Sequence, residues 1–186
     1  MAKLIYVTNV SLDGYVEDAQ GSFDWTAPID EVFTFITDLV RPVGTYLYGR
    51  RMYETMGVWE TQPALAAQSE LMAEFANVWQ TADKIVYSTT LHAVSTANTR
   101  LERRFDPDSV RDMKASAASD FTIGGPTLAA HAFSAGLVDE CNLFVCPVVV
   151  GDGKPAFHSD AHIQLELLEE RRFANGVVNL RYRVQT

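Results

Sequence analysis

The order of the apolar segments is the sequence feature that most constrains how this chain can fold. Through the first two-thirds, short β-branched runs typical of buried strands alternate with segments whose apolar residues recur at helical spacing. Strands are predicted at Lys3 to Thr8, Thr45 to Tyr48, Lys84 to Tyr87 and Phe121 to Ile123, and helices at 28–40, 50–56, 65–79, 106–117 and 127–135. This alternation is typical of an α/β protein with a parallel sheet.

The last third follows a different pattern. A long apolar strand is predicted from Glu140 to Val150, interrupted by Pro147. Two alternating runs, Ile163 to Leu167 and Val178 to Val184, flank Asn175-Gly176, which is a strong hairpin signal. We therefore predict an α/β fold with a central mixed, mostly parallel sheet flanked by helices and a C-terminal antiparallel hairpin.

Length and composition exclude several classes of protein. The 186 residues suit one domain, which we place at residues 1–186. A formal net charge of −9 argues against a nucleic-acid-binding surface. An anionic ligand would need a local basic spot, for which the candidates are Arg50-Arg51 and the group Arg100, Arg103 and Arg104. No apolar run approaches the roughly 18 residues of a membrane span, and the N-terminus lacks a signal-peptide pattern, so a cytoplasmic protein without membrane contact is predicted.

Cysteine and histidine usage predicts no metal centre. Cys141 and Cys146 are too few for a disulfide framework, and their spacing within a strand predicts buried free thiols on opposite faces. His158 and His162 stand four apart, but no glutamate is placed as in a zinc-binding helix. A surface loop is predicted there instead.

Three predicted strand ends carry residues suited to phosphate binding. They are Gly49-Arg50-Arg51, Ser88-Thr89-Thr90 and Gly124-Gly125-Pro126-Thr127. In an open α/β sheet, ligands bind at the carboxyl ends of the strands. Glycine allows close backbone approach, a helix N-terminus offers free N–H groups, and arginine or hydroxyl groups donate to phosphate. The three together indicate a phosphate-bearing ligand such as a nucleotide, although each glycine alone is also explained by a tight turn.

The chain lacks the familiar fingerprints of nucleotide and hydrolase sites, which leaves one carboxylate as the best candidate for chemistry. Neither G-x-G-x-x-G, nor the Walker A sequence, nor G-x-S-x-G is present. Asp13 follows the first strand, near the expected ligand edge, and a turn-forming role remains the alternative. Nearby aromatic residues, among them Tyr15, Trp25 and Phe33, could cover a flat heterocycle or simply pack in the core.

Five motifs in a fixed order resemble the dihydrofolate reductase-like superfamily. They are Ser11-Leu12-Asp13-Gly14-Tyr15-Val16, Leu47-Tyr48-Gly49-Arg50-Arg51-Met52-Tyr53-Glu54, Lys84-Ile85-Val86-Tyr87-Ser88-Thr89-Thr90-Leu91, Ile123-Gly124-Gly125-Pro126-Thr127-Leu128, and Gly136-Leu137-Val138-Asp139-Glu140 with the strand that follows. The resemblance covers nearly the whole chain. It is strongest to the branch related to the C-terminal reductase domain of the bifunctional riboflavin-biosynthesis deaminase/reductase.

The resemblance implies an NADPH-dependent reductase that transfers a hydride to a C=N or C=O type group of a small heterocycle. The named family activity is that of 5-amino-6-(5-phosphoribosylamino)uracil reductase. The implied cofactor-binding residues are Gly49, Arg50, Arg51, Met52, Ser88, Thr89, Ile123, Gly124, Gly125, Pro126, Thr127 and Leu128, often with a cis Gly-Gly bond. Leu12, Asp13, Tyr15, Trp25 and Phe33 would border the substrate, with Asp13 as the catalytic candidate. Related domains often dimerise, which implies a homodimer.

Two departures from the family pattern keep other functions open. Counting back from the Gly-Arg motif, the acidic position of dihydrofolate reductases falls on Phe33, and Met52 stands where the superfamily commonly has threonine. No deaminase domain is present. The alternatives are therefore a non-catalytic nucleotide- or ligand-binding protein on the same fold, a dihydrofolate reductase, and a structural dimer module. The dimer module is supported only by the apolar run from Leu143 to Val150.

Overall fold

The computed structural model describes residues 1–158 and 161–185. Ser159 and Asp160, in the segment predicted as a loop between His158 and His162, lie outside this part of the chain. Within it, no helix combines the length and the apolar character needed to cross a membrane.

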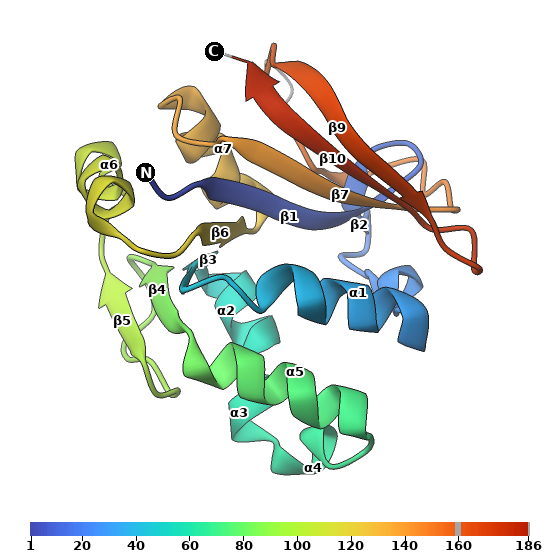
Figure 1. Cartoon of the computed structure of the whole chain (residues 1–186), viewed down its shortest axis with the longest axis horizontal. Coiled ribbons are helices and arrows are strands. Elements are labelled where there is room, and N and C mark those ends of the chain that lie inside the picture. The colour runs from blue at the N-terminus through green and yellow to red at the C-terminus, as the bar shows by residue number, and fades with distance from the viewer. Residues whose placement is uncertain (159–160, 186) are drawn as a thin grey trace.

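The described residues form one eight-stranded sheet with the predicted mixed topology (Figure 1). Its order is β5 (Thr99–Glu102), β4 (Asp83–Tyr87), β3 (Thr45–Gly49), β6 (Phe121–Gly124), β1 (Leu4–Ser11), β7 (Glu140–Cys146), β10 (Val178–Gln185) and β9 (Gln164–Arg172). The first six strands of this order run parallel, and β10 and β9 form the antiparallel C-terminal hairpin. The predicted fold class is therefore confirmed.

Helices cover both faces of this sheet. They are α1 (Asp30–Val40), α2 (Arg50–Met56), α3 (Val58–Thr61), α4 (Pro63–Ala66), α5 (Glu70–Thr81), α6 (Pro107–Ser116) and α7 (Pro126–Ser134), with a short 3₁₀ turn η1 at Asp24–Thr26. Successive side chains on a strand point to opposite faces. On β3, Leu47 therefore packs into one core with residues of α6 and α7, while Tyr46 and Tyr48 pack into another with residues of α1 and α5.

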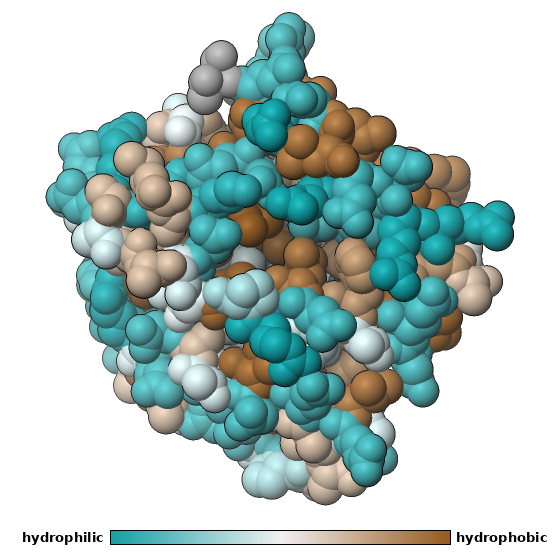
Figure 2. All heavy atoms as spheres, viewed as in Figure 1, coloured by the Kyte–Doolittle hydropathy of each residue, from teal (hydrophilic) through white to brown (hydrophobic). Residues whose placement is uncertain are grey.

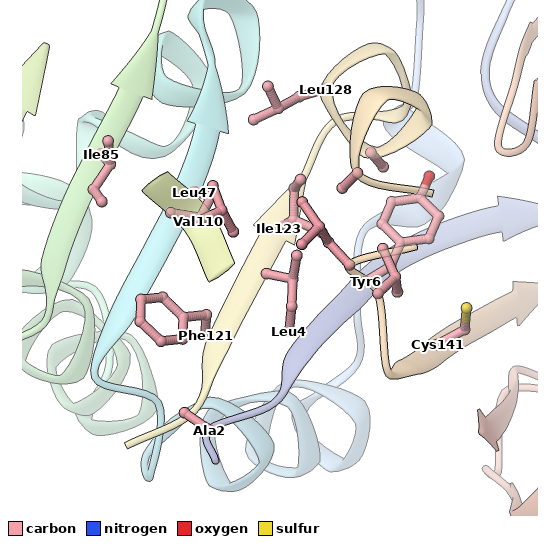
Figure 3. Close-up of a cluster of buried hydrophobic side chains, with 14 of the residues drawn as sticks. Ala2, Leu4, Tyr6, Leu47, Ile85, Val110, Phe121, Ile123, Leu128 and Cys141 are labelled. Carbon is pink, nitrogen blue, oxygen red and sulfur yellow. The ribbon is translucent and has the colours of Figure 1, made fainter. Parts of the chain in front are cut away.

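The core on the α6 and α7 side is assembled from residues far apart in the sequence. Figure 3 shows Leu4, Leu47, Ile85 and Ile123, from four parallel strands, gathered with Leu128 of α7 and Val110 of α6. The first four of these side chains are almost completely buried. Outside, on the face shown in Figure 2, apolar residues gather in the middle and hydrophilic residues surround them.

Several predicted boundaries shift for identifiable local reasons. The helix predicted at 65–79 is divided into α4 and α5, because the Ser69 hydroxyl accepts a hydrogen bond from the Met72 amide and starts a new helix. The strand predicted from Glu140 to Val150 ends at Cys146, just before Pro147, which has no N–H to donate to the ladder. The unassigned segment 92–104 contains the edge strand β5.

The C-terminal turn and the two cysteines agree with the sequence. Gly176, between β9 and β10, has a φ of 86°, which glycine adopts without strain. Cys141 packs in the α7-side core and Cys146 in a third cluster with residues of α1, so the two buried thiols face opposite sides of β7. Burial, with a smaller contribution from the charge of Glu140, raises the pKa of Cys141 to about 12.

A small two-stranded ribbon lies outside the main sheet, and the sequence indicates only its first strand, as a brief extension at Tyr15 to Glu17. It pairs β2 (Tyr15–Asp18) with β8 (Gly153–Pro155), and Glu17 stands opposite Lys154. Gly153 has a φ of 153°, and a Cβ there would lie 2.0 Å from the Glu17 carbonyl oxygen. The Gly151-Asp152-Gly153 sequence therefore makes a turn into β8 and allows the two strands to approach closely.

Candidate functional site

The three strand ends predicted to bind phosphate lie side by side. Strands β4, β3 and β6 are neighbours and run parallel, so their carboxyl ends meet at one edge of the sheet. Gly49 ends β3 and precedes α2, and Gly125 follows β6 and precedes α7. Ser88 follows β4, and its hydroxyl accepts hydrogen bonds from the amides of Thr90 and Leu91.

A pocket of about 400 Å³ opens at this edge, and we call it the polar pocket. Ten of the twelve predicted cofactor residues line it, and the other two, Ile123 and Gly124, line a second pocket described below. Four cationic residues, Arg50, Arg51, Arg103 and Lys154, contribute to its wall together with hydroxyl residues such as Ser88 and Thr89. The pocket is therefore suited to an anionic ligand.

The start of α7 forms a backbone cradle in this pocket. Gly125 occupies the N-cap position with a φ of 93°, and no side chain caps the helix. The first helical hydrogen bond runs from the Ala129 amide to the Gly125 carbonyl, so the amides of Thr127 and Leu128 have no partner within the helix. Free amides and the helix dipole together favour a phosphate group at this position.

The glycines beside this cradle are required for different reasons. A Cβ on Gly124 would lie 3.1 Å from both Met52 Cγ and Tyr48 Cε1, so a larger residue would push these side chains out. At Gly125 the positive φ itself favours glycine. The cis Gly-Gly bond that the resemblance implied is not found, since the described residues contain no cis peptide bond. The chain turns instead through the positive φ of Gly125.

The arginines of the polar pocket are held by neighbouring groups. Arg50 donates to the Glu54 carboxylate at 2.8 Å and to the Thr90 hydroxyl at 3.1 Å. Arg51 binds both carboxylate oxygens of Glu17 at 3.0 Å. These contacts hold the two guanidinium groups at the pocket while leaving their side chains about half exposed or more.

The far wall of the polar pocket is formed by Arg103, Phe105 and His131. Arg103 belongs to the basic group that the sequence offers for an anionic ligand, whereas Arg100 and Arg104 line neither pocket. Arg103 donates to the backbone carbonyls of Ser88 and Leu91 and so holds the loop after β4. Phe105 stacks on His131 of α7, with ring centroids 6.3 Å apart, and the sequence analysis selected neither of these two residues.

A second pocket, of about 450 Å³, continues from the first, and we call it the apolar pocket. It lies between the sheet and the helices α1, α2, α3 and α5. Phe33, Trp59 and Phe75 form an aromatic wall, with centroid distances of 4.8 to 5.9 Å. On the sheet side, Tyr46 and Tyr48 stack with their rings 5.6 Å apart and nearly parallel.

The two pockets form one groove. Arg51, Met52, Gly125, Pro126 and Lys154 line both of them. The groove is polar and basic at one end and aromatic at the other. Such a groove can hold the phosphates of a dinucleotide at the first end and place its reactive ring beside a second, apolar ligand.

The structure brings only one of the predicted substrate residues to this groove. Phe33 lines the apolar pocket, whereas Leu12, Tyr15 and Trp25 line neither pocket. Leu12 is 68% exposed. Trp25 packs with the cluster around Phe144 and Phe173.

Asp13, the predicted catalytic residue, also lies outside both pocket linings. Its carboxylate accepts hydrogen bonds from the amides of Val150 at 3.2 Å and Gly151 at 2.7 Å. A hydrogen bond from Ser11 lowers the pKa of Asp13, and the two amides add to this effect, so that together they outweigh the opposing effect of desolvation. In this position the carboxylate ties the turn after β1 to the loop that leads into β8.

Fold and groove together place the chain in the dihydrofolate reductase-like class of α/β proteins. The family model described as the RibD C-terminal domain matches residues 2–179, and the chain belongs to this family. The resemblance to the reductase domain of riboflavin biosynthesis is thereby confirmed.

Relatives of this chain include proteins that match it from end to end. The uncharacterized protein YyaP of Bacillus subtilis is 29% identical over 97% of this chain and 94% of its own length. A putative riboflavin biosynthesis protein from Shewanella superposes with a TM-score of 0.76 at 20% identity, covering all of both chains. A dihydrofolate reductase from Enterococcus faecalis, solved in complex with NADP(H), gives 0.65 at 10% identity, covering 99% of this chain and 97% of its own. These structural likenesses concern the fold.

Proposed function

We propose that the protein is an NADPH-dependent reductase that transfers a hydride to a small heterocyclic substrate. The observation that carries the proposal is the groove itself. Twelve residues selected from separate parts of the sequence for cofactor binding all line its two connected pockets. The matching family and the NADP(H)-bound dihydrofolate reductase of the same fold support this function.

The residues of the polar pocket fit a dinucleotide phosphate group. The free amides at the start of α7 would bind the pyrophosphate, with Gly125 allowing close backbone approach. Arg50 and Lys154 would add positive charge, and Ser88 and Thr89 would donate from the adenosine side of the pocket. The aromatic pair Phe105 and His131 offers a flat surface at the same end.

Bound NADPH supplies a hydride, and the chain's own residues position and shield the reaction. Met52 and Gly125, at the junction of the pockets, would set how far the nicotinamide extends toward the substrate. The aromatic wall of Phe33, Trp59 and Phe75 would exclude water from the reacting carbon. Asp13 lines neither pocket, so its carboxylate is not proposed as the donor of the proton that completes the reduction.

Titration of the purified protein with NADPH, monitored by calorimetry, tests the cofactor. Binding in the micromolar range, with a rise in thermal midpoint, supports the proposal, and no binding at millimolar NADPH contradicts it. NADPH oxidation in the presence of a panel of pteridines, aminopyrimidines and quinones then tests turnover. Tight NADPH binding without any turnover would favour the alternative of a non-catalytic nucleotide-binding protein.

Two further expectations accompany this function. We propose that the protein works in the cytoplasm, where the NADPH pool is available to it. We also propose that it forms a homodimer, as related domains do. A monomeric mass in light scattering at working concentration would contradict the dimer.

A further inference from the structure

We infer that the apolar pocket takes a flat, uncharged aromatic molecule that carries no phosphate group. This inference rests on the proposed function, because it concerns the substrate end of the same groove. It departs from the phosphoribosyl substrate of the reductase that the chain resembles. Three observations on the apolar pocket carry it.

The first observation is the distribution of charge. Among described residues, only Glu17, Arg51 and Lys154 bring charged side chains to the apolar pocket. Glu17 and Arg51 neutralise each other through two hydrogen bonds of 3.0 Å. Arg51 and Lys154 also line the polar pocket, so both cations lie at the junction, where an anionic cofactor would use them. The uncharged polar groups of the lining come from threonines, Asn9 and the hydroxyls of Tyr46 and Tyr48.

The inner end of the apolar pocket therefore offers no counter-ion to a phosphate. A phosphate monoester carries a charge between −1.5 and −2 at neutral pH, roughly. Placing such a group without a cation in an apolar environment costs far more than aromatic contacts return. A phosphorylated substrate would have to displace Glu17 from Arg51 or compete with the cofactor for Lys154.

The second observation is the shape of the aromatic surfaces. Phe33 comes from α1, Trp59 from α3 and Phe75 from α5, and all three rings are in mutual contact. Tyr46 and Tyr48 present two stacked rings from β3 on the sheet side of the same pocket. Aromatic surfaces on both sides favour a planar ring, which can make stacked and edge-to-face contacts with them.

The third observation is an unused hydrogen-bonding group. The Tyr48 hydroxyl accepts a hydrogen bond from Trp79 Nε1 at 3.1 Å. The Tyr46 hydroxyl, in contrast, is buried and has no partner among the described residues. Among the described residues that line the apolar pocket, Tyr46 is the only one with a buried side-chain polar atom that lacks a hydrogen-bond partner. Burial raises the pKa of Tyr46, so the hydroxyl keeps its proton. It can donate to an acceptor on a ligand that moves aside the side chains covering it.

A pair of probes that differ only in phosphate tests the inference. Calorimetry compares 1-naphthol with 1-naphthyl phosphate on the full chain saturated with NADP⁺, so that the polar pocket is filled. We expect 1-naphthol to bind more tightly by roughly tenfold or more, the scale expected for an uncompensated buried charge. Equal or tighter binding of 1-naphthyl phosphate overturns the inference, and so does a lack of binding by both probes.

Tyr46→Phe tests the hydrogen bond without emptying the pocket. Its affinity for 1-naphthol should fall roughly two- to tenfold, the net effect of one neutral hydrogen bond. The thermal midpoint of the free protein should stay the same or rise, because the variant removes an unpaired buried hydroxyl. Tyr182→Phe is the matched control, because Tyr182 of β10 lines neither pocket, and this variant should bind 1-naphthol like the wild type. If Tyr46→Phe binds 1-naphthol as tightly as the wild type does, the inference that the Tyr46 hydroxyl donates to the ligand is wrong.

The two proposals fail in different ways in these measurements. If NADP⁺ itself does not bind, the proposed reductase function is wrong, and the probes are then compared on the free protein. If NADP⁺ binds and the naphthyl phosphate is preferred, the reductase function stands and the substrate class is wrong.

Discussion

Replacing Arg50 with alanine removes the cation that the structure holds at the start of α2. In the free protein its guanidinium donates to Glu54 and Thr90, and its side chain is 46% exposed. An exposed pair at this spacing contributes only about 0.3 to 0.5 kcal/mol to stability. We therefore expect Arg50→Ala to fold normally, with a thermal midpoint close to that of the wild type.

The expected loss lies in cofactor affinity. A hydrogen bond to a charged group contributes about 1.5 to 3 kcal/mol. Removing Arg50 also leaves the Glu54 carboxylate without its partner beside the anionic ligand, which adds repulsion. The dissociation constant for NADPH should therefore rise roughly 10- to 150-fold. Because part of this difference is electrostatic at an exposed site, it should shrink as salt is raised.

Calorimetric titration with NADPH at low and high salt measures both effects. Arg104→Ala is the matched control, because Arg104 is exposed and lines neither pocket, and its affinity should equal that of the wild type. An unchanged dissociation constant in a folded Arg50→Ala variant would refute the assignment of Arg50 to the cofactor site. Equal losses in both variants would show that only overall charge matters.

Three other substitutions probe the loops around the groove. Gly125→Ala places a side chain at a φ of 93°, so urea denaturation should show a free energy of unfolding lower by about 1 to 3 kcal/mol, and NADPH should bind more weakly. Gly136→Ala is its control, because Gly136 also has a positive φ, of 64°, but lines neither pocket. This control should lose stability and keep its NADPH affinity. Asp13→Ala should lower the thermal midpoint, because it removes the carboxylate that binds the amides of Val150 and Gly151, and it should leave the NADPH affinity unchanged. A folded variant that binds NADPH but has lost all turnover would instead assign a catalytic role to Asp13. Burial of Glu140 opposes ionisation, but hydrogen bonds from Arg181 and Lys3 outweigh it and lower the pKa of this carboxyl. The ionised Glu140 carboxylate thus stabilises the fold fully at pH values above 4.5, the ordinary pKa of this group, and the stabilisation is lost as the pH falls through the lower pKa of the folded protein. Glu140→Gln should flatten the fall of the urea midpoint between about pH 5 and pH 3, and an unchanged slope would contradict this.

The local pattern of the sequence is sufficient for most of the fold because each strand and helix has to bury an apolar side. The periodicity around Phe33 and Ile36 predicts α1, and Asn175-Gly176 predicts the hairpin of β9 and β10. Boundaries fail where a single hydrogen bond or a missing donor decides them, as at Ser69 and Pro147.

The candidate site divides in the same way. The predicted cofactor residues follow strands directly, and parallel strands bring their carboxyl ends to one edge, so their place in the groove could be predicted without coordinates. The basic group of Arg100, Arg103 and Arg104 is visible in the sequence, but only the tertiary contacts select Arg103, which binds the carbonyls of the loop after β4. Lys154 could not be found from the sequence, because it reaches the groove through the pairing of β8 with β2. For Asp13 the sequence predicted a place at the ligand-binding edge of the sheet, because this residue follows the first strand. In the structure its carboxylate binds two backbone amides and lies outside both pockets.

The alternation of strands and helices, the hairpin and the strand ends suited to phosphate can all be inferred from the amino-acid sequence, because they depend on periodicity and turn chemistry within a few residues. The character of the apolar pocket, in contrast, follows from tertiary contacts. Phe33, Trp59 and Phe75 meet there from three separate helices, and the Tyr46 hydroxyl is buried without a partner among the described residues. Contacts between distant segments and the burial of single atoms depend on how the helices pack on the sheet, and no local pattern encodes that packing.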